Sequence, residues 1–233
     1  MNAPLLRVLL ASLLLSLGAA AQEGPKTTQP VPKDEKRHQG FVEIAKKGDV
    51  DLLFLGDSIT DGWRGKGGKK IFDEQFSPLK AANFGIGGDR TQHVLWRLKN
   101  GELEGIQPKV AMLMIGTNNG GDSAEDVAAG ITAIVKEIQA KSPKTKVLLL
   151  GIFPRGEKPN PGREKNDKVN GIVAKLDDGG KTVKYADIGE KFLQPDKTIS
   201  KEIMPDFLHL SEKGYQIWAD AVLAPIKELL AAK

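Results

Sequence analysis

Five short runs of apolar residues constrain the fold more strongly than any other feature of this sequence. The runs occupy residues 50–55, 81–85, 110–115, 146–152 and 183–187. Nearly continuous apolar runs of this length are typical of strands that are buried on both faces, and such strands occur in parallel sheets covered by helices. The sequence therefore predicts a five-stranded parallel sheet.

Amphipathic stretches alternate with these runs. Apolar residues recur at helical spacing over residues 91–99, 123–141, 166–176 and 211–230. Alternating strands and helices predict an α/β fold with helices on both faces of the sheet, a three-layer flavodoxin-like sandwich. We expect one domain over residues 40–233, because a chain of 233 residues has room for one well-packed core of this kind.

The first 21 residues have the pattern of a secretory signal peptide. Arg7 precedes an apolar stretch over residues 8–17, and the small residues that end at Ala21 form the expected cleavage site. A membrane-spanning helix needs about 20 apolar residues, and this stretch is shorter. We therefore predict an exported protein, periplasmic or extracellular, with no stable membrane anchor after the signal is cleaved.

Residues 22–39 differ in composition from the segment that follows. They are polar, carry charges of both signs and include Pro25, Pro30 and Pro32. This composition is typical of extended connecting segments. We expect a linker or a loosely attached N-terminal arm here.

Composition and motifs exclude several classes of function. The chain has no cysteine and three scattered histidines, so we expect no disulfide, no thiolate nucleophile, no metal site and no cofactor. Its net charge of +4 comes from bases spread along the chain, which does not indicate nucleic-acid binding. The glycine-rich stretch at residues 85–88 does not complete a dinucleotide-binding motif, because Arg90 stands where the third glycine would be.

Candidate catalytic residues follow the first two apolar runs. In doubly wound sheets, ligands bind beyond the carboxyl ends of the strands. Ser58 follows the first run at such a position, and Gly85, Gly87 and Gly88 follow the second. Glycines let a backbone amide approach a ligand closely, so we expect the amide of Gly88 to donate a hydrogen bond to an oxyanion.

The third apolar run leads into two asparagines, Asn118 and Asn119. A side-chain amide at a strand end can donate a hydrogen bond to developing negative charge, which can contribute about 3 kcal/mol in an acyl-transfer transition state. Chemistry and spacing leave both residues as candidates.

Asp206 and His209 lie just before the last predicted helix. Two residues three apart in one turn lie on the same side, so the carboxylate can bond one ring nitrogen and leave the other to take a serine proton. His38 lies in the predicted linker, and His93 lies in the helix after the glycine-rich turn. His209 is therefore the best candidate for the base by elimination.

These blocks, in this order, resemble those of the SGNH (GDSL-like) hydrolase family. The resemblance covers the chain from about residue 50 to its end. Within the family, the chain is similar to the group of catalytic alpha subunits of brain-type platelet-activating-factor acetylhydrolases. The stretches that carry these similarities are residues 56–58, 76–79, 83–89, 93–104, 116–118, 154–161 and 206–209.

The resemblance implies a serine esterase with an SGNH hydrolase domain over residues 40–233. It implies a short acyl group, above all acetyl, on a small-molecule, glycan or lipid alcohol, and it suggests a homodimer. Because the similar alpha subunits are cytosolic, their regulatory partner is not expected for an exported chain. The resemblance favours Asn118 over Asn119 as the side-chain oxyanion donor. The site residues that it implies are the nucleophile Ser58, the pair Asp206 and His209, and the oxyanion donors Ser58, Gly88 and Asn118.

Two alternatives remain at this stage. A lysophospholipase or thioesterase would use the same chemistry on another substrate class. A non-catalytic glycan-binding module is disfavoured, because none of the catalytic residue types is missing. Trp63, Trp96 and Phe207 are the aromatic candidates for a pocket wall, and Trp96 between Leu95 and Leu98 suits core packing better.

Overall fold

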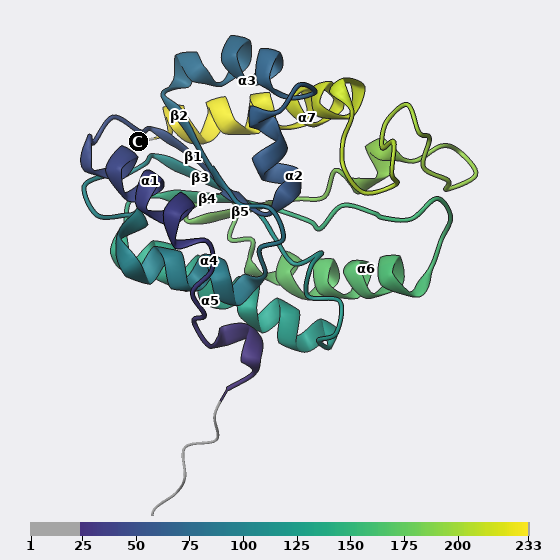
Figure 1. The fold of residues 1–233 in the computed structure, drawn as a ribbon, viewed down its shortest axis with the longest axis horizontal. Helices are drawn as coiled ribbons and strands as arrows, with labels where there is room; N and C mark the ends of the chain where they lie inside the picture. The colour runs from purple at the N-terminus through teal and green to yellow at the C-terminus, as the bar shows by residue number, and fades with distance from the viewer. Residues whose placement is uncertain (1–23, 233) are drawn as a thin grey trace, which may run out of the picture.

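A computed structural model describes residues 24–232, so the predicted signal peptide lies outside the described residues. Strands and helices alternate along the chain (Figure 1). The strands are β1 Leu52–Gly56, β2 Ala81–Gly85, β3 Val110–Met114, β4 Lys146–Leu150 and β5 Val183–Ala186. The α-helices are α1 Glu35–Lys46, α2 Ser58–Asp61, α3 Lys69–Gln75, α4 Thr91–Arg97, α5 Ala124–Lys141, α6 Pro161–Val173 and α7 Glu212–Ala231. The shorter helical turns are η1 Lys26–Thr28, η2 Gly62–Arg64, η3 Ser77–Leu79, η4 Leu98–Glu102, η5 Ala174–Leu176 and η6 Gly189–Phe192.

The five strands form one parallel sheet in the order β2-β1-β3-β4-β5, as the apolar runs predict. Leu52 of β1 lies opposite Ala81 of β2 on one side and Val110 of β3 on the other. The chain moves from β1 to one edge, then returns past β1 to build the rest of the sheet. The order of the strands therefore reverses between β1 and β3, and ligands of such sheets bind beyond the strand ends at that point.

Helices cover both faces of the sheet, which confirms the three-layer sandwich (Figure 1). Figure 1 places α2, α3 and α7 on one face and α4, α5 and α6 on the other. Alternate side chains of β1 enter the two cores: Leu53 and Leu55 pack with α1, α4, α5 and α6, while Leu52 and Phe54 pack with α2, α3 and α7. Burial on both faces is the reason that the strands read as continuous apolar runs.

Residues 24–39 pack against the domain instead of forming the linker or loose arm that their composition predicts. They contain η1 and the first residues of α1, and Thr27 and His38 are buried. The Thr27 hydroxyl donates to the backbone oxygen of Asp126 at 2.5 Å, and the backbone oxygen of Thr27 accepts from the Thr91 hydroxyl at 3.0 Å. Composition misses this packing because two buried residues and a few backbone contacts hold a segment that is otherwise polar.

The structure also shifts one helix boundary and adds short helices. The helix predicted over residues 166–176 begins at Pro161, because the Asn160 side chain caps the Arg163 amide and proline suits a first helical position. Helices α2 and α3 span four and seven residues, too few for a periodic apolar pattern to be recognised. Within residues 24–232, no helix is both long enough and apolar enough to cross a membrane.

Candidate active site

Ser58 lies at the carboxyl end of β1, where the chain turns into α2. It is the first residue of that helix and is half-buried. The preceding residue, Asp57, caps the helix, since its Oδ1 accepts a hydrogen bond from the Ile59 amide at 3.0 Å. The Oγ atom of Ser58 lies 3.0 Å from Nε2 of His209, a residue 151 positions later in the sequence.

The segment Asp206–His209 forms a tight turn before α7. Phe207 has a φ of +59°, a left-handed conformation that is uncommon for a bulky residue and that marks local strain. Oδ1 of Asp206 accepts from the amides of Leu208 at 3.1 Å and His209 at 2.7 Å. Oδ2 of Asp206 lies 2.7 Å from Nδ1 of His209, so the turn aims the other ring nitrogen at Ser58.

Electrostatics favour one protonation pattern in this row of side chains. Partial burial opposes ionisation of Asp206, but hydrogen bonds from the His209 ring and from the amides of His209 and Leu208 prevail and lower the pKa of its carboxyl. An ionised Asp206 accepts the Nδ1 proton of His209, which leaves Nε2 as an acceptor. The arrangement can therefore receive the Ser58 hydroxyl proton at Nε2.

The loop Ile86–Arg90, after β2, lies beside Ser58. A Cβ atom on Gly87 would lie 4.0 Å from the Cβ atom of Ser58, which shows how closely the loop approaches. Gly88 has a φ of +72°, a conformation that glycine adopts without strain. The loop that carries the Gly88 amide therefore approaches Ser58 closely.

Asn118 reaches the same loop from the end of β3. Its Nδ2 donates to the backbone oxygen of Asp89 at 2.9 Å, and its side chain stays half-buried. This contact uses one of the two N–H groups of Nδ2 and holds the side chain next to the glycines, leaving a second N–H group. The structure thus brings Ser58, the Gly88 loop and Asn118 together at the carboxyl ends of β1, β2 and β3.

Asn119, the other candidate by chemistry, has a different environment. It is fully buried, and its Oδ1 accepts from the Thr91 amide at 3.1 Å. Its Nδ2 donates to Gln92 Oε1 at 3.2 Å and to Asp122 Oδ2 at 2.9 Å. Its polar atoms therefore tie the β3 loop to α4.

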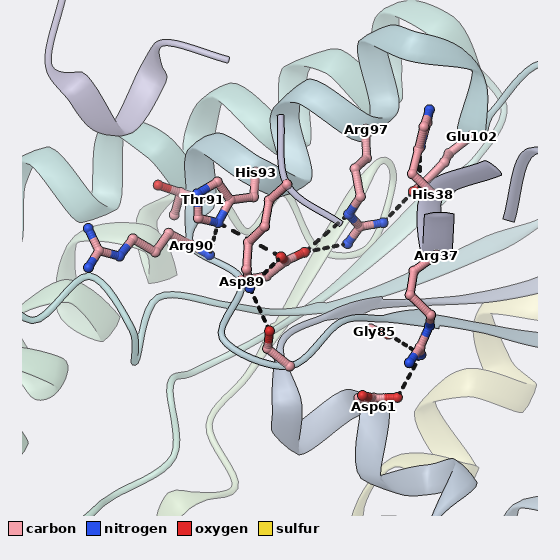
Figure 2. Close-up of polar contacts among 12 residues, drawn as sticks. Arg37, His38, Asp61, Gly85, Asp89, Arg90, Thr91, His93, Arg97 and Glu102 are labelled. Carbon is pink, nitrogen blue, oxygen red and sulfur yellow. Dashed lines mark hydrogen bonds and ion pairs between the residues drawn. The ribbon is translucent and has the colours of Figure 1, made fainter. Parts of the chain in front are cut away.

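The other two histidines, His38 and His93, make polar contacts with Glu102 and Arg90 (Figure 2). Nδ1 of His93 accepts from the Arg90 amide at 3.0 Å. Burial, then the positive charges of Lys33 and Arg90, lower the pKa of His93 to about 4, so it is neutral near pH 7. His38 is buried 3.0 Å from Glu102.

Asp57 has an unusual titration. It is fully buried, and burial raises its pKa to about 7 although the Ile59 amide favours the charged form. Among the described residues, its Oδ2 atom has no hydrogen-bond partner. A carboxyl group that changes its charge close to neutral pH therefore adjoins Ser58, and sequence reasoning gave it no role.

Of the three aromatic candidates, Phe207 lies in the turn between Asp206 and His209. Trp63 belongs to the core and is 1% exposed. Trp96 packs edge-on against His38, with ring centroids 4.8 Å apart. A groove of about 1030 Å³ between α1, α3 and β2 is lined by residues such as Trp63, Phe41 and Phe72, and by none of Ser58, Asn118 and His209.

Sequence reasoning also missed Asp89. Its backbone oxygen holds Asn118, and its buried carboxylate pairs with Arg97. The available signal was an acidic residue directly after a run of glycines. In residues 24–232, no cluster of three or more histidine, aspartate or glutamate side chains is arranged to hold a metal ion.

Comparison with known proteins places the chain in a family. Residues 54–217 match the model of the GDSL-like Lipase/Acylhydrolase family. The chain is 44% identical over 209 residues to the platelet-activating factor acetylhydrolase IB subunit alpha2 of Homo sapiens, with 88% of each chain covered.

Solved structures show the same fold. A structure from Streptococcus pneumonia, described as a platelet activating factor, matches with a TM-score of 0.69 and 25% identity, over 84% of this chain and 92% of that one. A carbohydrate acetylesterase from Sinorhizobium meliloti matches with a TM-score of 0.60 and 17% identity, over 77% of this chain and 99% of that one.

Proposed function

Because the chain belongs to the GDSL-like lipase/acylhydrolase family and is a carboxylic ester hydrolase, we propose that it is an exported serine esterase specific for short acyl groups, above all acetyl. The observation that carries the serine esterase part of this proposal is the hydrogen-bonded row of Ser58, His209 and Asp206. The two contacts in the row measure 3.0 Å and 2.7 Å. Distances of this length permit direct proton transfer between serine and histidine.

In the first step, Ser58 attacks the ester carbonyl carbon. Nε2 of His209 takes the hydroxyl proton as the oxygen–carbon bond forms, and ionised Asp206 stabilises the resulting imidazolium. The imidazolium then protonates the leaving alcohol, which produces an acyl-enzyme on Ser58. Water deacylates this intermediate by the same route, with His209 again as the base.

The negative charge of each tetrahedral intermediate forms on the former carbonyl oxygen. We assign its stabilisation to the amides of Ser58 and Gly88 and to Nδ2 of Asn118. Ser58 is a first helical residue, so its amide has no partner within the helix. The contact between Asn118 and the backbone oxygen of Asp89, at 2.9 Å, supports a common position for these donors.

The preference for acetyl rests on the relatives. The human relative that is 44% identical is an acetylhydrolase by name, and the Sinorhizobium neighbour is a carbohydrate acetylesterase by name. The alcohol part is a glycan, a lipid or a small molecule. A homodimer, which the family resemblance suggests, is tested by light scattering of the purified protein.

The first experiment measures hydrolysis of p-nitrophenyl acetate, butyrate and octanoate by the protein, next to Ser58→Ala. We expect rapid hydrolysis of the acetate, falling with chain length, and a loss of about 10⁴-fold or more in the variant. Octanoate as the preferred substrate would favour a lysophospholipase or thioesterase. An unchanged rate in the variant would contradict the role of Ser58.

Export rests on the N-terminal sequence pattern and has its own test. Full-length chain is expressed in a bacterial host, and the N-terminus of the protein is sequenced in the exported and cytosolic fractions. We expect exported protein that begins at Gln22, since the cleavage site follows Ala21. Cytosolic protein that retains residues 1–21 would contradict this part of the proposal.

A further inference from the structure

The peptide bond between Gly87 and Gly88 is contacted by a residue from outside the loop Ile86–Arg90. Nζ of Lys33 lies 2.5 Å from the backbone oxygen of Gly87 and 3.4 Å from Oδ1 of Asp89. Lys33 belongs to the N-terminal segment, 54 residues from Gly87 in sequence. Its ammonium group therefore contacts both the backbone and the side chain of the loop that carries the Gly88 amide.

Peptide geometry couples this contact to the oxyanion site. The oxygen of Gly87 and the N–H of Gly88 belong to one planar trans peptide unit and point in opposite directions. A group that fixes the direction of the Gly87 oxygen therefore also fixes the opposite direction, in which the Gly88 N–H points. Two consecutive glycines leave this unit free to rotate, since neither residue restricts its dihedral angles.

The charge of the ammonium group adds to the effect of its position. A hydrogen bond from a cation to a carbonyl oxygen is stronger than one between neutral groups. Hydrogen bonds in series polarise one another, so the cation on the oxygen makes the N–H of the same peptide a stronger donor. Lys33 therefore both orients and strengthens the Gly88 amide.

A buried series of ion pairs also holds the loop, through the carboxylate of Asp89 (Figure 2). Arg97 donates to Oδ2 of Asp89 through Nη2 at 2.9 Å and Nε at 3.1 Å, and it also pairs with Glu102. Glu102 in turn contacts His38 of α1 at 3.0 Å. Asp89, Arg97 and Glu102 are 0% exposed, and His38 is 2% exposed. The N-terminal segment thus meets the loop twice, through Lys33 directly and through His38 by way of this series.

We propose that residues 24–38, here called the strap, set the conformation of the loop Ile86–Arg90, here called the oxyanion loop, and that Lys33 is the positioning residue through which they act. This inference rests on the proposed serine esterase function. Lys33 touches no reacting atom. It holds the Gly87–Gly88 peptide so that the N–H faces the position where the oxyanion forms.

The test compares Lys33→Met, which keeps the length of the side chain and removes the charge, with Lys33→Arg and with Lys36→Met. Lys36 is exposed on the same segment and serves as the matched control. In assays with p-nitrophenyl acetate, we expect kcat of Lys33→Met to fall about 10- to 100-fold, because complete loss of one oxyanion donor costs about 10²- to 10³-fold. KM should change little, since the donor acts mainly in the transition state.

Three readouts separate positioning from a general structural role. Phenylboronic acid forms a tetrahedral adduct with an active-site serine, and its inhibition constant should rise by about the factor by which kcat falls. Lys33→Arg should restore most of the rate. The melting temperature of Lys33→Met should change by no more than about 4 °C, because the Lys33 side chain is partly exposed and buried Asp89 keeps its pair with Arg97.

Two results would overturn the inference. The first is wild-type kcat in Lys33→Met while Ser58→Ala is inactive, which leaves the esterase mechanism intact and removes the role of the strap. The second is a lower kcat in Lys33→Met without a matching rise in the inhibition constant of phenylboronic acid. An equal loss of kcat in Lys36→Met would count in the same way. Equal activity of wild type and Ser58→Ala is a separate outcome, because it contradicts the proposed function itself.

Discussion

At the scale of single residues, Asp57 faces two opposing requirements. As the cap of α2 it accepts from the Ile59 amide, and a helix N-terminus favours a negative charge. Complete burial favours the neutral form. Burial prevails, and the pKa of Asp57 rises to about 7. The residue next to Ser58 therefore gains a charge within the physiological pH range.

The first prediction concerns the stability of Asp57→Asn as a function of pH. Between about pH 4 and pH 7, the folded protein holds a proton on Asp57 that the unfolded chain has lost, so stability of the wild type falls by about 1.4 kcal/mol per pH unit from this group. Asparagine does not titrate. The free energy of unfolding of the variant relative to wild type should thus rise by about 3 kcal/mol over this range, because the linkage is only partial near either pKa.

Urea unfolding of both proteins at pH 4.5, 5.5 and 6.5 measures this difference. The comparison of slopes is independent of any constant effect of the substitution itself. Parallel stability curves would show that Asp57 is already ionised when folded.

The second prediction separates Asn118 from Asn119. Asn118→Ala should lower kcat by about 10²- to 10³-fold, because it removes an oxyanion donor, and should leave stability nearly unchanged. Asn119→Ala should lower the free energy of unfolding by about 1–3 kcal/mol, because it leaves the buried Thr91 amide without its acceptor. Parallel kinetic and unfolding measurements on both variants provide the check. A reversed pattern would contradict the assignment of the donor.

At the scale of elements, close contact between β2 and α2 places the serine. A Cβ atom on Gly85, the last residue of β2, would lie 2.4 Å from the amide nitrogen of Asp61. Only glycine lets the short helix approach the strand this closely. By contrast, Gly171 lies exposed in α6, and a Cβ atom there would meet no atom within 4 Å.

The third prediction uses these two glycines as a matched pair. Gly85→Ala should destabilise the protein by about 1–3 kcal/mol and lower kcat, since α2 and Ser58 must move away from the strand. Gly171→Ala should stabilise it by about 0.5–1 kcal/mol without affecting kcat, because alanine favours the helix. Chemical denaturation and esterase assays measure both effects. Equal stability of the two variants would contradict the contact at Gly85.

At the scale of the whole molecule, buried ionisable side chains join four elements of the chain. Arg97 at the end of α4 lies between Asp89 of the oxyanion loop and Glu102 of η4, and Glu102 contacts His38 of α1. Burial of these charges is tolerated because each has a charged or polar partner. The chain of contacts couples the N-terminal segment, one core and the candidate site.

The fourth prediction is that Arg97→Met destabilises the protein by about 3–5 kcal/mol, because it leaves buried Glu102 without its cation and leaves buried Asp89 with only the 3.4 Å contact to Lys33. Lys99→Met is the control, since the Lys99–Glu137 pair is near the surface and its loss should cost at most about 1 kcal/mol. Thermal and urea unfolding measure both variants. A small effect of Arg97→Met would show that water or rearrangement compensates the two acids.

The sheet could be predicted from the sequence with little error at its strand positions. Strands buried on both faces need apolar side chains throughout, so the runs before Ser58 and Asn118 are visible without any tertiary information. The positions of these polar residues after strands also indicated a site at one edge of the sheet. The short helices α2 and α3 could not be predicted, because their stability comes from packing and not from local pattern.

The sequence by itself determined the fold class and the residue types of a serine hydrolase, because both depend on local patterns: apolar runs, glycine turns and an acid–histidine pair. The tertiary structure alone decided how these patterns meet. It placed His209 against Ser58 across 151 residues, buried Asn119 while leaving Asn118 half-exposed, and packed the polar N-terminal segment on the oxyanion loop. Such contacts depend on distances between segments far apart in the chain, which composition and periodicity do not encode.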